Sequence, residues 1–325
     1  MTATLFRPSR RNALGLIGAA LVFPRSADAD AVGAISGAAF GTTWRVVGPR
    51  QADLEHLRAG IDALFASVDQ QMSPWRVDSG LSRFNAMPAG WQLADAELIH
   101  VTTSALSLAR SSEGAFDPTV GPLVAQWGFG PIEGGGQPDW RGISIGDGRI
   151  GKVRDDLTLD LCGIAKGRAL DRAVELAKNA GLDNLLFDLG GELKALGHHP
   201  SGRVWHVAVQ NPMPNGAAPT TLRLPAGQAV ATSGLSTQSY VLGAHTYGHI
   251  IDPAMRVPAD AGLLSVTVLA EDAMTADGWA TALFAAGLTD GPAVARANGV
   301  WALFLGQDGA APSQVTTGTI AGLLL

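Results

Sequence analysis

The chain has 325 residues, of which 46% are hydrophobic and 16% are charged, so it can bury one large core and is not intrinsically disordered. Its formal net charge of −6, without a run of Lys or Arg, argues against nucleic acid and anionic membrane surfaces as partners. The single cysteine, Cys162, excludes an intramolecular disulfide and a cysteine-rich zinc site, while 41 glycines and 18 prolines predict many tight turns, as in an α+β protein with short strands.

The first segment has the layout of a cleavable export signal. Arg10 and Arg11 precede an apolar run at 13–23, and the small-residue triplet Ala27-Asp28-Ala29 follows. The run is too short to span a bilayer, which needs roughly 20 apolar residues. The paired arginines are similar to those of a twin-arginine signal, although a general secretory signal fits the same layout. We expect residues 1–29 to be removed by cleavage and the mature chain to lie in an extracytoplasmic space, such as the periplasm.

The first part of the mature chain predicts a strand, two helices and a polar segment between them. Residues 38–47 alternate in hydrophobicity like a strand, and residues 51–67 and 94–111 each have an apolar face at helical spacing. Between the helices, residues 72–85 are too polar and turn-rich for a core element, so we expect a loop over a site. Trp75 in this loop is either a ligand contact or a partly buried anchor, and the anchor is the more common role.

A turn follows the second helix, in the run 114–123. Asp117 precedes Pro118, which holds it out of the helical region, so its carboxylate is presented rigidly, either to a ligand or within an ordinary turn. Residues 127–146 are glycine-rich and predict an irregular surface excursion.

Residues 158–171 combine the end of a predicted strand, a glycine turn at Gly163 and a helix that opens at Lys166. The free N–H groups and the positive dipole end of a helix N-terminus favour a phosphate, and the lysine would add a positive charge. An ordinary β–α connection with a surface lysine explains the same segment equally well.

The second half of the chain predicts mostly short strands. Two of them, 184–189 and 192–196, flank the pair Gly190-Gly191, which is a short-range hairpin signal. Further strands are expected at 205–210, 221–224, 229–231 and 263–270, with a helix at 273–286, and segments 293–298 and 300–305 complete the fold.

Two places in this half carry groups suited to chemistry. Asp277 and Thr281 lie one turn apart on the predicted helix, so two oxygen atoms point in the same direction. Hard oxygen donors without His or Cys suit Mg²⁺ rather than zinc, although an acid near a helix N-terminus also interacts favourably with the helix dipole without any metal. His249 stands beside an Asp-Pro turn and can accept a proton near neutral pH, but a lone histidine more often only satisfies hydrogen bonds.

Several of these segments resemble, in the same order, the motifs of the ApbE family, the FAD:protein FMN transferases. Residues 160–171 are similar to the family signature D-L-G-G-I-A-K-G-x-x-x-D, and residues 114–123 and 249–253 to its G-A-F-D-P-T-V-G-P-L and H-I-I-D-P runs. Shorter matches lie at residues 40–42, 73–85, 188–191, 232–234 and 276–281. The chain departs from the family pattern at Phe40, Cys162, Arg168, Leu235, Gln238 and Arg256.

The resemblance covers residues 38–305 and implies an α+β, ApbE-like fold of short mixed or antiparallel sheets with packed helices, followed by a C-terminal tail at 306–325. It implies Mg²⁺ as cofactor, held by the main-chain carbonyl near Gly163 and the side chains of Asp277 and Thr281. His249 is the candidate for activating a hydroxyl. The implied contacts to FAD come from Phe40, Trp75, Ala115, Phe116, Asp117, Asp160, Lys166 and Ile250.

The reaction that this resemblance implies transfers FMN from FAD to a Thr or Ser hydroxyl of a target protein, with AMP as the leaving group. The target is free or membrane-associated, and no nucleic acid takes part. Two other functions need the same pocket: an FAD pyrophosphatase that gives the phosphate to water, and a non-catalytic exported flavin-binding protein.

Overall fold

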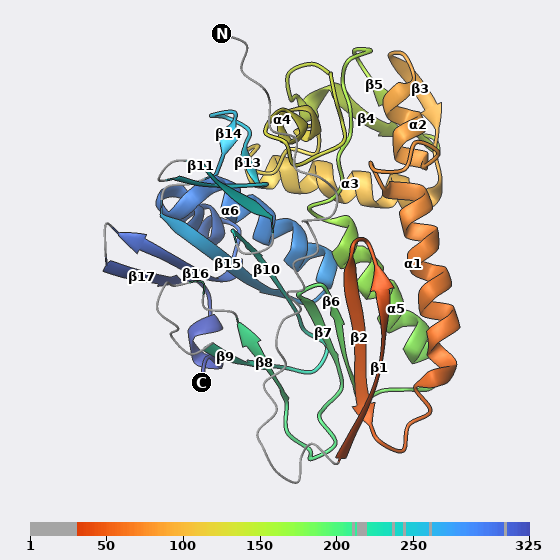
Figure 1. The fold of residues 1–325 in the computed structure, drawn as a ribbon, viewed down its shortest axis with the longest axis vertical. Helices are drawn as coiled ribbons and strands as arrows, with labels where there is room; N and C mark the ends of the chain where they lie inside the picture. Colours follow the sequence, from red (N-terminus) through yellow and green to blue (C-terminus); the bar gives the residue numbers. More distant parts are fainter. Residues whose placement is uncertain are drawn as a thin grey trace.

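The computed structural model describes residues 31–209, 212, 220–235, 238–242, 245–259, 262–308 and 311–325 (Figure 1). The predicted export signal at 1–29 lies outside the described residues. The main feature is an eight-stranded antiparallel sheet with the strand order β1-β2-β6-β7-β10-β15-β16-β17. Its strands are β1 (Val32–Ala39), β2 (Thr42–Pro49), β6 (Leu185–Leu189), β7 (Glu192–Leu196), β10 (Ala229–Gly234), β15 (Leu263–Ala270), β16 (Trp301–Asp308) and β17 (Ala311–Thr316).

Helices and small sheets surround this sheet. The helices are α1 (Arg58–Met72), α2 (Gly80–Ala86), α3 (Ala96–Ser111), α4 (Gly121–Gln126), α5 (Ala165–Asn179) and α6 (Ala273–Ala297), with 3₁₀ turns at Glu55–Leu57, Trp140–Gly142 and Ile320–Leu323. The small sheets pair β3 (Gly90–Leu93) and β4 (Ile143–Gly146) with β5 (Arg149–Lys152), β8 (Trp205–Val209) with β9 (Thr220–Leu224), β11 (Ser239–Leu242) with β12 (His245–Gly248), and β13 (Ile251–Asp252) with β14 (Val257–Pro258). Mixed helices and antiparallel strands confirm the α+β prediction.

Both faces of the main sheet are covered, and a separate hydrophobic core lies against each face. Val46 and Phe187 belong to the large core under the helices. Val47 and Leu186, their neighbours along the strands, belong to a second core against the β8–β9 hairpin. Because successive side chains of a strand point to opposite faces, each central strand fills both cores. Figure 1 shows α5 and α6 packed on the same face of the sheet. The candidate site described below lies on this face.

Several element predictions are confirmed. Helix α3 and strand β15 match the predictions at 94–111 and 263–270, and the hairpin around Gly190-Gly191 forms as expected. The short strands β8, β9 and β10 lie where strands were predicted, although residue 210 lies outside the described part.

Other predictions are wrong or incomplete. The helix expected at 51–67 is α1, which begins only at Arg58, and the irregular stretch expected at 127–146 contains β4. Residues 38–47 are not one strand, because Phe40 (φ 51°) and Gly41 (φ 73°) both adopt left-handed backbone angles and turn β1 into β2. The expected loop at 72–85 contains helix α2, whose first turn is capped by the Ser79 hydroxyl accepting from the N–H of Ser82 at 2.9 Å. The expected tail at 306–325 contributes β17 to the sheet edge.

Candidate active site

Residues 158–163, which lead into α5, are held by hydrogen bonds to the Asn85 side chain rather than by pairing with a strand. The strand predicted at 158–161 is wrong, since these residues form no strand. The Asn85 amide nitrogen donates to the carbonyl of Leu159 at 2.8 Å, and the Asn85 Oδ1 accepts from the Leu159 N–H at 2.7 Å. The N–H of Asp160 donates to the carbonyl of Pro118 at 2.7 Å. The two segments 72–85 and 114–123 therefore fix the backbone just before Gly163.

Helices α5 and α6 cross in close contact through Gly167. A Cβ atom on Gly167 would lie 2.2 Å from the carbonyl oxygen of Ala273, so only glycine fits this crossing. At the same place the N–H of Gly167 donates to Asp277 Oδ2 at 2.9 Å. The helix that carries Lys166 is thereby locked to the helix that carries Asp277.

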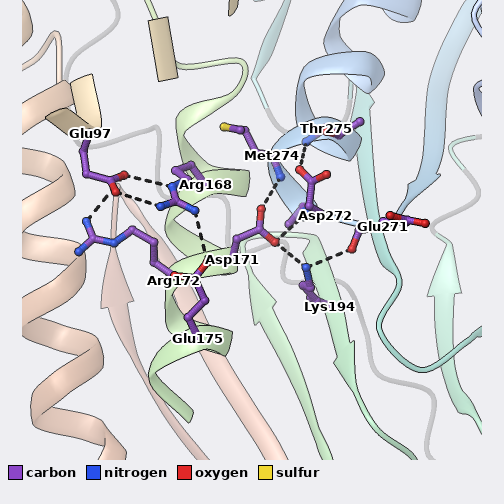
Figure 2. A network of polar contacts seen from close by, with 11 residues as sticks. Glu97, Arg168, Asp171, Arg172, Glu175, Lys194, Glu271, Asp272, Met274 and Thr275 are labelled. Atoms are coloured by element: carbon purple, nitrogen blue, oxygen red, sulfur yellow. Dashed lines mark hydrogen bonds and ion pairs between the residues drawn. The ribbon is translucent and has the colours of Figure 1, made fainter. Parts of the chain in front are cut away.

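Asp171 closes the same contact one turn further along α5 (Figure 2). Its Oδ1 accepts from the N–H of Ala273 at 2.8 Å, and its Oδ2 accepts from the N–H of Met274 at 2.9 Å. Lys194 of β7 donates to the same carboxylate at 2.8 Å. A buried acid thus satisfies free N–H groups at the start of α6, where the helix dipole favours negative charge. The last acid of the 160–171 segment is therefore a positioning residue that sets where α6 begins.

The Asp171→Asn variant should be destabilised by about 2–4 kcal/mol, because it weakens two N–H contacts and leaves Lys194 without its buried counter-charge. Urea unfolding of the purified variant measures this. The matched control is Glu175→Gln on the same helix, whose exposed carboxylate only meets Arg168 at 3.5 Å and whose loss should cost less than about 1 kcal/mol. Equal stability of the two variants would contradict the role given to Asp171.

The three predicted metal residues come together at the start of α5 and on α6. The hydroxyl of Thr281 donates to the carbonyl of Gly163 at 3.3 Å, and Asp277 lies one helical turn before Thr281. A Cβ on Gly163 would meet the Thr281 hydroxyl oxygen at 3.1 Å, so glycine lets the two segments approach. Ser233 of β10 adds a further hydroxyl at 3.4 Å from that of Thr281. Carbonyl and hydroxyl oxygens therefore converge beside a buried acid.

The electrostatics of Asp277 fit a cation site. Burial raises the pKa of Asp277 to about 7, and the nearby Glu192 adds to the rise while Lys166 opposes it. A nearby divalent cation would favour the charged carboxylate. Within the described residues there is no cluster of three or more His, Cys, Asp or Glu able to hold a metal. One carboxylate, one hydroxyl and one carbonyl suit a hard cation whose remaining ligands come from water or phosphate.

Lys166 pairs with Glu192, an acid that was not among the predicted site residues. Its Nζ lies 2.5 Å from Oε1 of Glu192, which is 4% exposed and whose Oε2 has no hydrogen-bond partner. Burial alone would lower the pKa of Lys166, but Glu192 and Asp277 outweigh it and raise that pKa. Asp188, across the glycine turn, accepts from the N–H of Gly191 at 3.1 Å, and burial raises its pKa to about 6. In the sequence, an acid stands on each side of Gly190-Gly191, where a hairpin and a short family match were predicted but no site residue.

The residues near Gly163 that were predicted to contact the nucleotide differ in burial and in hydrogen-bond partners. Asp160 Oδ1 accepts from the N–H of Cys162 at 2.9 Å. Phe116 is buried, and its ring lies 3.3 Å from where a Cβ on Gly163 would stand. Asp117 caps its own turn, because its Oδ1 accepts from the N–H of Thr119 at 2.8 Å and from the Thr119 hydroxyl at 2.6 Å. Burial raises the pKa of Asp117. Asp160 and Phe116 therefore lie beside the predicted metal residues, and Ala115 directly precedes Phe116 in its turn.

Phe40 and Trp75 lie on the α1 side of the site. The ring of Phe40 packs 5.5 Å from that of Phe65 on α1, and its turn is tied to the β6–β7 turn by the N–H of Gly190, which donates to Thr43. Trp75 is 62% exposed in the connection between α1 and α2, so it is not the buried anchor that such a tryptophan usually is. Contact of either ring with a flavin stays a prediction.

His249 directly follows β12, and its ring is oriented by a backbone carbonyl. Its Nδ1 lies 3.2 Å from the carbonyl of Gln238, so Nδ1–H donates and Nε2 is left as the acceptor. Burial, with a smaller contribution from the positive charge of Lys166, lowers the pKa of His249 to about 4. The imidazole is therefore neutral at pH 7 with a free lone pair on Nε2, and it is a weaker base than a free imidazole. Ile250, the next residue, is buried, and its carbonyl accepts from the N–H of Ala259.

Comparison with known proteins finds one family throughout. A model of the ApbE family matches residues 40–304. An FAD:protein FMN transferase of Vibrio cholerae is 34% identical over 291 residues (83% of this chain, 86% of the relative), and one of Klebsiella pneumoniae is 32% identical over 331 residues (95% and 94%). Among solved structures, the flavin transferase ApbE of V. cholerae superposes with a TM-score of 0.81 at 32% identity, covering 90% of this chain and 99% of that one. An apo flavinyl transferase ApbE of Pseudomonas stutzeri gives the same TM-score and identity over 90% and 96% of the two chains.

Proposed function

The chain belongs to the ApbE family, and from this premise we propose that it transfers the FMN moiety of FAD to a Thr or Ser hydroxyl of a target protein. It is an FAD:protein FMN transferase, as its relatives are. The observation that carries the mechanism is the meeting of the Gly163 carbonyl, the Thr281 hydroxyl and the buried Asp277 at the α5–α6 crossing.

The proposed reaction is a single displacement at phosphorus. The acceptor oxygen attacks the FMN-side phosphorus of FAD, a new P–O bond forms, and the bond from that phosphorus to the bridging oxygen breaks, so that AMP leaves with that oxygen. The hydroxyl proton passes to Nε2 of His249, which is neutral at pH 7 because burial lowers its pKa to about 4. Attack and departure lie roughly in line in such transfers, so His249 serves the side opposite to AMP.

Mg²⁺ fits the donor set, and we propose that Gly163, Asp277 and Thr281 hold it. When bound, Mg²⁺ supplies positive charge that offsets the pyrophosphate and its developing leaving group. Lys166 and Asp160, beside these residues, orient the nucleotide. The remaining contacts proposed for FAD are Phe40, Trp75, Ala115, Phe116, Asp117 and Ile250.

One incubation separates this function from its two alternatives. Mature protein, FAD, Mg²⁺ and a protein acceptor should yield AMP together with flavin that stays on the acceptor after denaturation. AMP accompanied by free FMN would identify a pyrophosphatase, and neither product would identify a flavin-binding protein without activity.

We also propose that the chain acts outside the cytoplasm, on an acceptor that is either free or membrane-associated. The support is the signal-like layout of residues 1–29. Within the described ranges, no helix is long and apolar enough to cross a membrane.

Changing Arg10 and Arg11 together to lysine should leave precursor in the cytoplasm, because the twin-arginine route depends on that pair. Fractionation followed by immunoblotting measures the precursor. Undiminished mature protein outside the cytoplasm would show that the pair is not read as a twin-arginine signal.

A further inference from the structure

A row of aromatic rings runs outward from His249. Its ring meets the edge of Phe129, with centroids 6.4 Å apart, and Phe129 stacks on Tyr240 at 5.2 Å. Tyr240 stacks on its cross-strand partner Tyr247 at 5.5 Å, and Tyr247 stacks on Trp127 at 5.6 Å. Aromatic contacts of this kind fix the orientation of the groups that make them. The β11–β12 hairpin is therefore braced against residues 127–129 and is held beside His249.

Trp127 extends this surface to a second hairpin. Its indole N–H donates to the carbonyl of Arg256 at 3.3 Å, in the turn that joins β13 to β14. That turn exposes Met255 to 70%, and the adjoining β14 exposes Val257 to 42%. The two hairpins flank His249 in sequence as well, since β12 ends at Gly248 and β13 begins at Ile251.

Two successive apolar side chains of β11 are exposed, one on each face of the hairpin. Val241 is 71% exposed and Leu242 is 67% exposed, and all four residues of β11 are exposed. Exposed apolar side chains gathered on one braced element mark a contact site, whereas single ones need no explanation. Because Val241 pairs with Thr246, three residues before His249, it lies roughly 10 Å from the backbone of that histidine at strand spacing.

The proposed function decides what covers this surface. The acceptor is a protein, so the residues on either side of its hydroxyl must run past His249 and leave the site over neighbouring elements. FAD is instead directed to Gly163, Asp277 and Lys166, on the other side of the reacting phosphorus. We propose that Val241 and Leu242, with Met255 and Val257, dock the acceptor segment that flanks the modified Thr or Ser, through apolar side chains of that segment. This inference rests on the proposed function.

The test replaces Val241 and Leu242 together by glutamate and measures transfer to one purified protein on which the wild type deposits covalent flavin. The KM for that acceptor should rise at least 10-fold. FAD affinity, measured by flavin fluorescence, and thermal stability should stay as in the wild type. A milder pair, Val241→Thr with Leu242→Gln, should give a smaller rise and guards against a folding defect in the first variant.

The chain offers a matched control on another face. Leu93 of β3 is 82% exposed and Val153, next to β5, is 65% exposed, and Figure 1 shows β3 and β5 at the upper right, away from β11 at the upper left. Leu93→Glu with Val153→Glu adds the same charge to equally exposed side chains and should leave the acceptor KM unchanged.

The outcomes separate this inference from the function beneath it. If the wild type releases AMP but labels no protein, the proposed function fails whatever the hairpin does. If the wild type labels the acceptor and the Val241/Leu242 variant does so with an unchanged KM, or if FAD affinity falls together with acceptor KM, the docking role is overturned. A wild-type dimer that the same variant turns into a monomer would assign the surface to a second copy and overturn it too.

Discussion

Asp277→Asn should lower AMP release and flavin transfer by about 10³-fold or more. The substitution keeps an oxygen that can accept from the N–H of Gly167, so the α5–α6 contact survives while the negative charge is lost. Metal assistance contributes several kcal/mol to such a reaction, and each 1.36 kcal/mol corresponds to tenfold in rate. Product AMP is measured by chromatography and covalent flavin by in-gel fluorescence.

The same variant tests the coupling between metal and substrate. FAD titrated into the wild type should bind more tightly with Mg²⁺ than without it, and Mg²⁺ should bind more tightly with FAD, because the coupling free energy is reciprocal. Asp277→Asn should lose most of this coupling. Thr281→Val should be milder, since it removes a neutral ligand and its hydrogen bond to Gly163. Transfer at full rate in Asp277→Asn, or in the wild type with EDTA, would reduce Asp277 to an acid that only pairs with Gly167.

His249→Ala should lower transfer by roughly 10²–10⁴-fold and leave FAD binding nearly intact. The ring nitrogen that faces Gln238 is committed to a hydrogen bond, so the variant removes one available acceptor, Nε2, without removing a contact from the fold's core. Steady-state kinetics with FAD and the acceptor varied separately measure the two effects. Equal losses of binding and transfer would make His249 a positioning residue, and normal transfer would move the role to another group.

The pH profile gives His249 a second signature. Since burial lowers its pKa to about 4, the ring becomes protonated, and transfer falls, only as the pH drops through about 4 rather than through 6.5. Protonation of His249 should therefore cause no fall in the wild-type rate between pH 7 and 5.5. The fall in rate near pH 4 should be absent in His249→Ala. A limb near 6.5 that His249→Ala abolishes would show that the ring is solvated during turnover.

The parts of the fold that local periodicity specifies were predictable from the sequence. Helix α3, strand β15 and the hairpin at Gly190-Gly191 each depend on residues within their own span. The turn at Phe40 was missed because a phenylalanine rarely adopts a left-handed backbone, so only Gly41 signalled it. Helix α2 was missed because it buries only Leu81 and Phe84, which is too few apolar residues to show a period.

The site was predictable where one segment contains the chemistry and not where distant segments meet. Asp277 and Thr281 share a helix face, which spacing shows directly. The link from Asn85 to Leu159 spans 74 positions and replaces the strand ladder that the apolar pattern suggested. Glu192 is 26 positions from Lys166, and nothing local to either residue predicts that they pair.

Gly287 divides α6 into two helical parts, of which only the first carries predicted site residues. Its φ of 76° interrupts the helix after the half that bears Asp277 and Thr281, and a new hydrogen-bonding ladder begins beyond it. Pro292 then lies five residues after this break, near the start of the second half, instead of in the middle of one long helix. Because the helix is interrupted there, we expect a tilt of the second half to be absorbed at Gly287 rather than passed on to Asp277 and Thr281. A substitution beyond Gly287 should therefore disturb the site less than one placed before it.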